Sequence, residues 1–310
     1  MKTIYLLGEC MVELRAIEDG VMHQSFAGDV YNSAVYLKRC FPGIATSLIT
    51  AVGKDKLSDA MLNCFESENI ESKFAFRHPN KVPGLYLVET DKEGERSFTY
   101  WRSDSAARQV MTFLEDDVIE QLTSGDMFFF SGISLAVIEE CSRDAFWQKL
   151  KQLKQAGVKV VFDPNYRARL WDSPKQAKTQ FEIAFQLSDL ALPGVEDLSE
   201  LYNISSAQGV IEFCHHHEVE EVVVKNGPES VLTCVEGTVL THGITPVSNI
   251  VDTTSAGDAF NGVYLGARLS GRTVSDAVQL AALAAGTVIQ HPGAIAPQAA
   301  FNQAMSNAGI

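Results

Sequence analysis

The chain has 310 residues, 46% of them hydrophobic and 21% charged, which are ordinary values for a soluble globular protein with a large core. Its net charge of −14, from 25 Lys and Arg against 39 Asp and Glu, argues against general binding to nucleic acid or anionic membranes, because those partners are bound through basic surfaces. Six cysteines without a Cys-x-x-Cys pair, no signal-peptide pattern and no apolar run near the ~18 residues that span a bilayer predict a cytoplasmic protein with free thiols.

The first 70 residues alternate between strand-like and helix-like segments. The expected elements, in chain order, are strands at 4–7 and 11–14, a helix from Gly28-Asp29 to near Pro42-Gly43, a strand at 47–52 and a helix through 61–65. Such an alternation predicts a parallel sheet with helices packed on its faces.

Residues 72–102 interrupt this alternation with a hairpin pattern. Pro83-Gly84 precedes a strand at 85–90, residues 91–95 form a turn, and 96–102 follow as a second strand. Together with residues 10–14, the hairpin could form a small sheet. We expect this sheet to act as a lid built from about residues 10–26 and 72–105, with an edge extension or a dimer contact as the alternative.

The alternation resumes after the hairpin. The expected strands are 127–131, 158–162, 190–192 and 222–225, with two further strand-like runs at 231–235 and 239–242. Expected helices are 137–156, 176–187, one ending at 211–217, and then 259–269, 274–290 and 298–307. Because no repeat or linker interrupts the pattern, we predict one α/β domain over residues 1–310, with the lid as an excursion from it.

Polar residues and glycines collect at the ends of several predicted strands. They are Gly8-Glu9, Gly53, Gly132, Asp163-Pro164-Asn165 and Lys225-Asn226-Gly227. Ligands of open α/β sheets bind beyond the carboxyl ends of the strands, so a site is expected there. The absence of a Walker-A sequence, and of Gly-x-Gly-x-x-Gly after the first strand, supports neither a P-loop NTPase nor a Rossmann dehydrogenase.

The stretch 252–260, Asp-Thr-Thr-Ser-Ala-Gly-Asp-Ala-Phe, leads small residues directly into a helix. A glycine at the start of a helix lets backbone N–H groups converge on an anion, and the helix dipole favours negative charge there. Asp258 places a carboxylate in the same turn, an arrangement that suits phosphoryl transfer. A capping aspartate after a glycine turn is the alternative that this stretch alone leaves open.

Arginines and aromatic residues follow the same segments. Arg102 ends the hairpin, while Arg167 and Arg169 follow a strand end, so the three could converge on an anionic group. Surface salt bridges are the alternative for each of them. Tyr86 and Tyr100 could pack over a sugar-like ligand, although aromatic residues in strands also serve simple packing.

Taken together, these residues resemble the ribokinase-like (PfkB) family of carbohydrate kinases over essentially the whole chain. Residues 252–258 resemble its C-terminal signature, residues 26–32 its N-terminal signature, and the hairpin falls where the family has its lid. Within the family, segments 8–14, 83–86, 100–107, 131–136, 162–171 and 293–295 look like those of kinases acting on 2-keto-3-deoxygluconate. The resemblance implies a ribokinase-like three-layer α/β/α fold with a mostly parallel sheet and a β lid.

The resemblance also implies a mechanism and a set of substrate contacts. Asp258 would be the general base for the terminal (6-) hydroxyl, with Ala256, Gly257 and the Asp258 amide forming the anion hole. Sugar hydroxyls and the keto acid would be bound by Gly28, Asp29, Asn32, Tyr86, Tyr100, Arg102 and Arg167.

Nucleotide and metal positions are implied in the same way. ATP would lie at Asn165, Lys225, Asn226, Gly227 and Gly257, and Mg²⁺ would be placed through water by Glu196. Some members of the family use a monovalent cation such as K⁺, for which Asp252 and Thr254 are the matching positions.

The chain departs from the family pattern at three positions. Ser255 and Ala27 stand where glycines are usual, and Pro193 replaces the Asn of the Asn-x-x-Glu motif that ends at Glu196. A fructokinase or another sugar kinase of the family is the alternative activity, and a non-catalytic sugar-acid sensor is the alternative from another class. The lid also predicts a homo-oligomer, because it doubles as a dimer surface in relatives of this kind.

Overall fold

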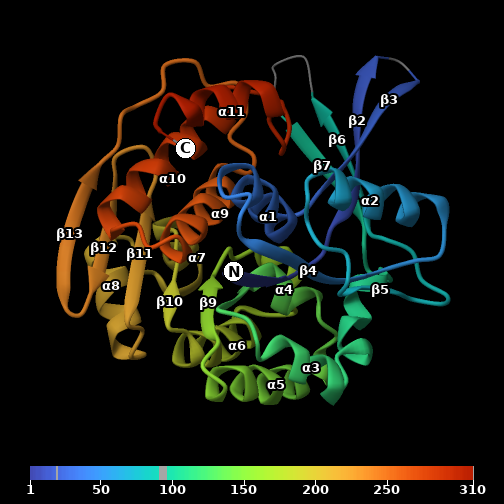
Figure 1. Ribbon diagram of the computed structural model, residues 1–310, viewed down its shortest axis with the longest axis horizontal. Helices are drawn as coiled ribbons and strands as arrows, with labels where there is room; N and C mark the ends of the chain where they lie inside the picture. Colours follow the sequence, from blue (N-terminus) through green and yellow to red (C-terminus); the bar gives the residue numbers. More distant parts are fainter. Residues whose placement is uncertain (19, 91–95, 310) are drawn as a thin grey trace.

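A computed structural model describes residues 1–18, 20–90 and 96–309, and its largest element is a nine-stranded sheet (Figure 1). The strands lie in the order β13-β12-β11-β10-β9-β8-β1-β4-β5. Pairing is parallel from β5 to β11, and β12 and β13 extend the sheet in antiparallel orientation. The bounds are β1 Thr3–Leu7, β4 Ala45–Val52, β5 Ala75–Arg77, β8 Met127–Ser131, β9 Lys159–Asp163, β10 Leu190–Ala191, β11 Glu221–Asn226, β12 Ser230–Val235 and β13 Thr238–Gly243.

Helices cover both faces of this sheet because successive strand residues point to opposite sides. Ile4 and Leu6 belong to one core cluster, whereas Tyr5 and Leu7 belong to the other. The first cluster is shared with α1 Asp29–Cys40, α2 Lys56–Ser67, α9 Ala256–Leu269, α10 Val274–Val288 and α11 Gln298–Ser306. The second is shared with α3 Asp116–Leu122, α4 Gly132–Val137, α5 Arg143–Gln155, α6 Pro174–Leu187, α7 Val195–Tyr202 and α8 Ala207–His216. The predicted three-layer α/β/α architecture is confirmed.

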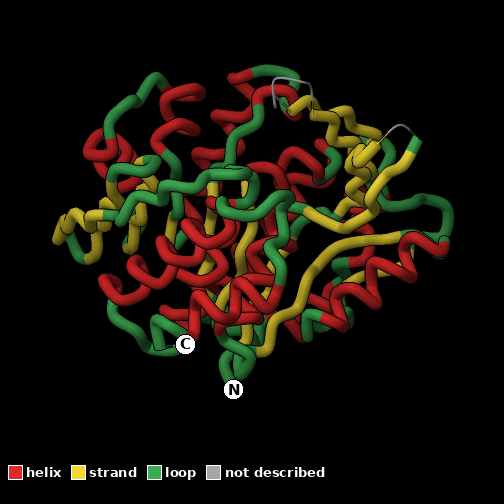
Figure 2. The backbone as a smooth tube through the Cα atoms, turned by 90° about the horizontal axis from the view of Figure 1, so that it is seen from above, coloured by secondary structure: helices red, strands yellow, loops and turns green. Residues whose placement is uncertain are grey.

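A smaller sheet projects from one end of the molecule, at the upper right of Figure 2. Its order is β3-β2-β6-β7, with bounds β2 Met11–Glu18, β3 Val21–Ala27, β6 Leu85–Thr90 and β7 Arg96–Trp101. β2 and β6 are parallel, and the outer strand pairs are antiparallel. The predicted hairpin is therefore confirmed, and its turn at 91–95 lies outside the described residues.

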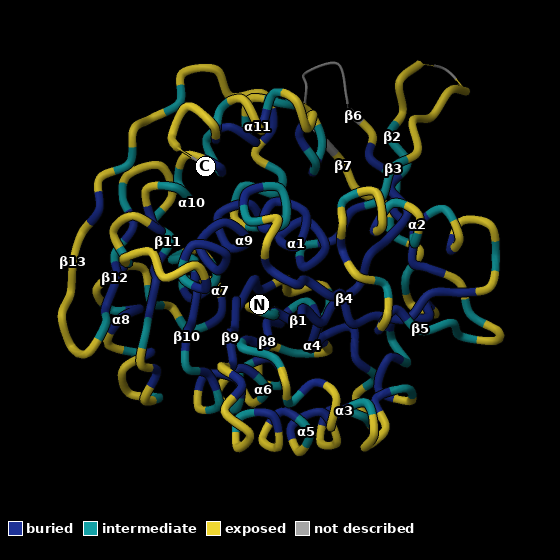
Figure 3. The backbone as a smooth tube through the Cα atoms, viewed as in Figure 1, coloured by how far each residue is buried: buried dark blue, intermediate teal, exposed yellow. Residues whose placement is uncertain are grey.

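The two faces of this second sheet differ in what they contact. Tyr86 and Val88 are buried against Ala294 of the main body, so their side is the inner face, and the register puts Tyr100 on it opposite Tyr86. Leu85 and Trp101 lie opposite each other on the outer face. The far ends of β2 and β3 are exposed (Figure 3).

Several boundaries differ from the sequence-based expectation. Ala75–Arg77 pairs with β4 and extends the main sheet, so the expected lid boundary at residue 72 is too early. Its pattern was missed because three residues are too short to show a period. The helix expected at 137–156 begins only at Arg143, as α5, and the preceding α4, which Ser131 caps directly after β8, was not expected. Val21–Ala27, expected within the lid but not as a strand, alternates too weakly to be recognised. No helix in the described residues has both the length and the apolar character that crossing a bilayer requires.

Helices α1 and α9 pack with their backbones in contact. A Cβ at Gly262 would lie 2.1 Å from the carbonyl oxygen of Ser33 and 3.1 Å from the amide nitrogen of Leu37. Only glycine allows this approach, which brings the first turns of the two helices together.

We therefore expect Gly262→Ala to destabilise the protein by about 2 kcal/mol or more, because the added methyl group meets backbone atoms that cannot move aside. The free energy of unfolding from urea denaturation measures this. Gly43→Ala is the matched control, since nothing lies within 4 Å of its added Cβ, and it should change stability by less than about 0.5 kcal/mol. Equal effects of the two substitutions would contradict the close approach.

Candidate active site

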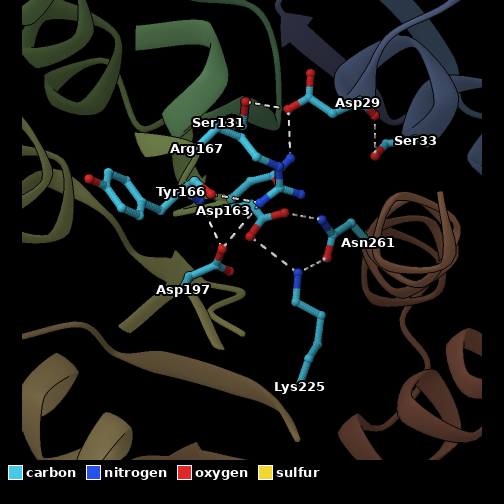
Figure 4. Close-up of polar contacts among 10 residues, drawn as sticks. Asp29, Ser33, Ser131, Asp163, Tyr166, Arg167, Asp197, Lys225 and Asn261 are labelled. Carbon is cyan, nitrogen blue, oxygen red and sulfur yellow. Dashed lines mark hydrogen bonds and ion pairs between the residues drawn. The ribbon is translucent and has the colours of Figure 1, made fainter. Parts of the chain in front are cut away.

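Polar residues at the carboxyl edge of the main sheet meet the first turns of α1 and α9 (Figure 4). Asp163 ends β9 and Lys225 lies near the end of β11, while Asp29 begins α1 and Asn261 lies in α9. Residues from four segments that are far apart in the sequence thus form one group. This is the position at which open α/β sheets bind ligands, so we take it as the candidate active site.

The start of α9 presents backbone amides to this site. Ser255 caps the helix in the left-handed region, with φ 65°, and Ala256, Gly257 and Asp258 form the first turn. The first amides of a helix have no intrahelical partner, and the helix dipole makes this end positive. A Cβ at Gly257 would lie 3.8 Å from the Lys225 Nζ, so the turn and this ammonium group border the same space. The geometry agrees with the predicted anion hole, whose role stays a proposal.

Asp258 is held within this turn by a residue of α1. The Asn32 side-chain amide donates a hydrogen bond of 2.8 Å to its Oδ2. Burial raises the pKa of Asp258 to about 7, and the negative charge of Asp29 adds to the rise, against the lowering effect of the Asn32 bond. A carboxylate with this pKa is a far better proton acceptor near neutral pH than an unperturbed aspartate.

Asp29 is the second carboxylate at this junction. Its Oδ2 accepts a hydrogen bond from the Ser131 hydroxyl at 2.6 Å (Figure 4) and another from the Asn165 amide at 3.0 Å. Burial raises its pKa as well, and the charge of Asp163 contributes. Asn165, which the resemblance assigns to the nucleotide, thus contacts a residue assigned to the sugar. Gly28 is needed next to Asp29 because a Cβ there would lie 2.1 Å from the Glu9 carbonyl oxygen.

Lys225 belongs to a buried polar triad that the sequence did not reveal. Its Nζ lies 3.2 Å from Asp163 Oδ1 and 3.2 Å from Asn261 Oδ1, and the Asn261 amide donates to Asp163 Oδ2 at 2.6 Å (Figure 4). Asp163 and Asn261 are both almost fully buried. The triad fixes the ammonium group beside the start of α9. Sequence reasoning missed Asn261. This residue lies three positions after Asp258, and residues three apart share one face of a helix.

Arg102 does not stand free in the site. One of its guanidinium nitrogens lies 2.5 Å from Glu9 Oε2, and the Glu9 side chain is 1% exposed. Gly84 leaves room for this pair, because a Cβ there would lie 2.7 Å from Glu9 Oε1. A carboxylate of the chain itself therefore already balances the charge of Arg102.

Arg167 is half-exposed and also has partners within the chain. Its guanidinium donates to the Tyr166 carbonyl oxygen at 2.7 Å and lies 3.6 Å from Asp197 Oδ1 (Figure 4). The same Asp197 oxygen accepts a hydrogen bond from the Tyr166 amide at 2.9 Å, and burial raises the pKa of Asp197 to about 6. Arg167 is thus tied to the start of α7, with its solvent side open.

The predicted aromatic contacts lie on the inner face of the second sheet. Tyr86 and Tyr100 stack with ring centroids 5.6 Å apart, and the Tyr86 hydroxyl donates to Glu13. The Arg169 guanidinium carbon lies 4.1 Å from the centroid of the Tyr100 ring. The loop after β9 therefore touches the second sheet.

The remaining predicted positions surround this centre. Asn226 and Gly227 form the turn after β11, where Gly227 has φ 57° and Asn226 donates to the Ser230 hydroxyl at 3.4 Å. Asp252 is buried, and its two carboxylate oxygens accept from the amides of Thr254 and Gly293, each at 2.8 Å.

Oxygen ligands for a divalent metal are sparse but suitable. Glu196 lies exposed in the first turn of α7, next to Asp197. Within the described part of the chain, no group of three His, Cys, Asp or Glu side chains is arranged to hold a metal. Mg²⁺ usually retains waters and binds through one or two carboxylates together with substrate phosphates, so this donor set fits it.

Comparison with known proteins gives the family. The model of the pfkB family carbohydrate kinases matches residues 1–300. The chain belongs to this family. This kinase is similar to the 2-dehydro-3-deoxygluconokinases of Escherichia coli K12, with 38% identity over 97% of this chain and 99% of the relative, and of Haemophilus influenzae, with 35% identity over 99% of each. It is less similar to the fructokinase of Salmonella typhimurium, at 26% identity over 83% of this chain and 81% of the relative.

Solved structures share the fold of the kinase. A PfkB protein from Polaromonas sp. JS666 superposes with a TM-score of 0.85 at 24% identity, covering 97% of this chain and 99% of its own. A fructokinase from Xylella fastidiosa with bound ATP has a TM-score of 0.84 at 19% identity, covering 99% of both chains. The ribokinase-like fold, with its second sheet, is thereby established for this chain.

The raised pKa of Asp258 predicts a pH-dependent effect on stability. A folded-state pKa above the unfolded value near 3.8 adds stability that is complete below that value and is lost as the pH rises through about 7. Asp258→Asn removes this loss, so the variant should be more stable than the parent at pH 8, by up to about 4 kcal/mol, and the difference should shrink towards pH 4. Urea denaturation across this pH range measures the difference.

Asp126→Asn is the control of opposite sign. Burial tends to raise the pKa of Asp126, but the Lys2 side chain and the Thr3 amide outweigh it and lower the pKa. This variant should therefore lose stability at pH 8. An Asp258→Asn protein that is less stable than the parent at pH 8 would contradict the raised pKa.

Proposed function

We propose that this kinase transfers the γ-phosphoryl group of ATP to the 6-hydroxyl of 2-keto-3-deoxygluconate, the compound also written 2-dehydro-3-deoxygluconate. The observation that carries the proposal is the Asp258 carboxylate, with its pKa near 7, in the first turn of α9 beside Lys225. The names of the relatives that match nearly the whole chain support the choice of substrate.

In the proposed reaction, Asp258 accepts the proton of the 6-hydroxyl while the hydroxyl oxygen forms a bond to the γ-phosphorus. The bond from that phosphorus to the β,γ-bridging oxygen breaks, and ADP leaves. The amides of Ala256, Gly257 and Asp258 hold the charge of the phosphoryl oxygens, aided by the helix dipole and by the Lys225 ammonium. Mg²⁺ supplies charge neutralisation on the phosphates when bound, and Glu196 would hold it through water.

The substrate contacts follow the same division of the site. Asp29 and Asn32, beside Gly28, would orient the sugar hydroxyls, because Asn32 donates to Asp258 and Asp29 lies near enough for its charge to act on Asp258. Tyr86, Tyr100, Arg102 and Arg167 would contact the keto-acid end. Lys225, Asn226, Gly227 and Gly257 would lie along the nucleotide, with Asn165 between the two substrates through its bond to Asp29.

Two further assignments remain predictions. The backbone bonds of Asp252 hold its carboxylate beside Thr254, which is compatible with a monovalent cation such as K⁺ there. A cytoplasmic location is predicted from the sequence.

A panel of acceptors tests the proposed activity. ADP release with ATP and Mg²⁺ should be fastest with 2-keto-3-deoxygluconate, and kcat/KM should rise with pH through about 7 as Asp258 loses its proton. Asp258→Asn should lower kcat by about a thousandfold, because the proton acceptor is lost while the shape is kept. Near-normal turnover by this variant would rule out Asp258 as the base.

The same panel separates the alternatives. A preference for fructose would indicate a fructokinase, as the similarity to the Salmonella typhimurium enzyme allows. No ADP release with any acceptor would indicate a sensor.

We also propose that the second sheet closes over the substrate and that its outer face binds a second copy of the chain. Leu14, Met22, Leu85, Leu87 and Trp101 line an apolar hollow of about 390 Å³ on this face, and Trp101 is 57% exposed. Such a surface is unfavourable in water unless it is covered.

Trp101→Glu should convert a dimer into a monomer, because it places a charge within the apolar contact. Sedimentation velocity at several concentrations measures the mass of both proteins. Val239→Glu, which replaces an exposed apolar residue of β13 at the opposite edge of the main sheet, is the control and should leave the mass unchanged. A parent protein that stays monomeric at high concentration would contradict the proposal.

A further inference from the structure

Three arginines lie at the end of β7 or in the loop after β9, which touches the second sheet, but their charges are not equally available. Arg102 is paired with the buried carboxylate of Glu9 at 2.5 Å. Arg167 lies 3.6 Å from Asp197 and donates to a backbone carbonyl. Among the residues that the structure describes, no carboxylate pairs with Arg169, which is exposed. The positive charge of Arg169 is therefore the least compensated of the three.

Arg169 reaches from the main body to the second sheet. It lies in the short helical turn Ala168–Leu170, a few residues after β9 ends at Asp163. Its guanidinium carbon is 4.1 Å from the centroid of the Tyr100 ring, and Tyr100 stacks in turn on Tyr86. Both tyrosines are on the inner face of the second sheet. Arg169 thus lies where the loop after β9 meets the inner face of the second sheet.

Stacking on an aromatic face leaves the donors of a guanidinium group usable. The cation interacts with the ring through its flat face, whereas its N–H groups point outwards in its own plane. A carboxylate can then be bound by two parallel N–H bonds at the edge of the group without displacing the ring. Tyr100 consequently holds the Arg169 side chain in place and neutralises none of its charge.

The surrounding field makes such a charge necessary for an acid substrate. Burial raises the pKa values of Asp29 and Asp258, the nearby charge of Asp163 adds to both rises, and the charge of Asp29 adds to the rise at Asp258. The whole chain carries a net charge of −14. An acceptor that brings its own carboxylate is repelled by this group unless a cation faces the carboxylate.

We propose that Arg169 is a specificity-determining residue that binds the carboxylate of an anionic acceptor, and that its stacking on Tyr100 presents it at the entrance between the second sheet and the β9 loop. This inference rests on the proposed sugar-acid kinase function. It adds Arg169 to Arg102 and Arg167, which the proposed function places at the keto-acid end, and Arg169 is the least compensated of the three charges.

The test compares acid and neutral acceptors in single variants. Arg169→Ala should lower kcat/KM for 2-keto-3-deoxygluconate by roughly tenfold or more while leaving the KM for ATP and the slow turnover of fructose unchanged. The kcat/KM of Arg169→Lys for 2-keto-3-deoxygluconate should lie between those of the parent and of Arg169→Ala, because lysine keeps the charge and loses the planar pair of donors. Direct binding of 2-keto-3-deoxygluconate, measured by calorimetry without nucleotide, should weaken by the same factor.

Arg272→Ala is the matched control for charge. Arg272 is exposed and lies just beyond the C-terminal end of α9, whereas the site is at the N-terminal end of that helix. Its loss changes the net charge equally and should leave the preference for acid over neutral acceptors unchanged. Arg167→Ala, measured in parallel, shows how far kcat/KM for the acid acceptor depends on Arg167, whose charge is partly compensated by Asp197.

The outcomes separate this inference from the proposed function. A parent enzyme that phosphorylates only neutral sugars overturns both. A parent enzyme active on the keto acid, with an unchanged preference in Arg169→Ala, overturns the inference alone. An equal loss on acid and neutral acceptors in Arg169→Ala also overturns it, because it would mean that the contact with Tyr100 serves only to hold the second sheet.

Discussion

The site depends on the backbone contact between α1 and α9. At Gly262 the two helices are closer than any side chain allows, since a Cβ would lie 2.1 Å from the Ser33 carbonyl oxygen. This approach brings the first turns together and lets Asn32 bond to Asp258 at 2.8 Å, although the two are 226 positions apart. Both helix N-termini carry partial positive charge towards the same point. The contact therefore both positions the carboxylates and offsets part of their mutual repulsion.

The remaining repulsion explains why the centre is unfavourable for stability and suited to proton transfer. Burial raises the pKa values of Asp29 and Asp258, and neighbouring carboxylates add to the rise: Asp163 for Asp29, and Asp29 with Asp163 for Asp258. Two backbone positions next to them are also in the left-handed region without being glycine, Asn165 with φ 33° and Ser255 with φ 65°. Strain of this kind persists only where the surrounding structure enforces it, and it gathers at functional sites. Ser255 adopts this left-handed conformation with a hydroxymethyl side chain, although glycine adopts it more readily.

The sequence predicted the layers of the fold well because hydrophobic periodicity reports which faces are buried. It missed β5, which is three residues long, and could not see that Ser131 starts a new helix. For the site, the resemblance indicated the right segments but not their pairings. That Arg102 faces Glu9, or that Asn165 faces Asp29, depends on distances between elements remote in the chain. The pKa of an ordinary aspartate likewise does not reveal that burial and the charge of Asp29 raise the pKa of Asp258.

In the proposed function, these pairings would divide the recognition of an acid between two kinds of arginine. A buried guanidinium needs a counter-charge, because the cost of removing a lone ion from water is large. Glu9 supplies it for Arg102, and the resulting neutral pair can orient a ligand but attracts its charge little. An exposed guanidinium keeps its charge, but salt screens it over about 8 Å at physiological ionic strength. Stacking Arg169 on Tyr100 at the border of the second sheet avoids both limits, because closure of that sheet would exclude water around a cation that has no carboxylate partner within residues 1–18, 20–90 and 96–309. Discrimination for the acid would then be strongest only when the sheet has closed over it.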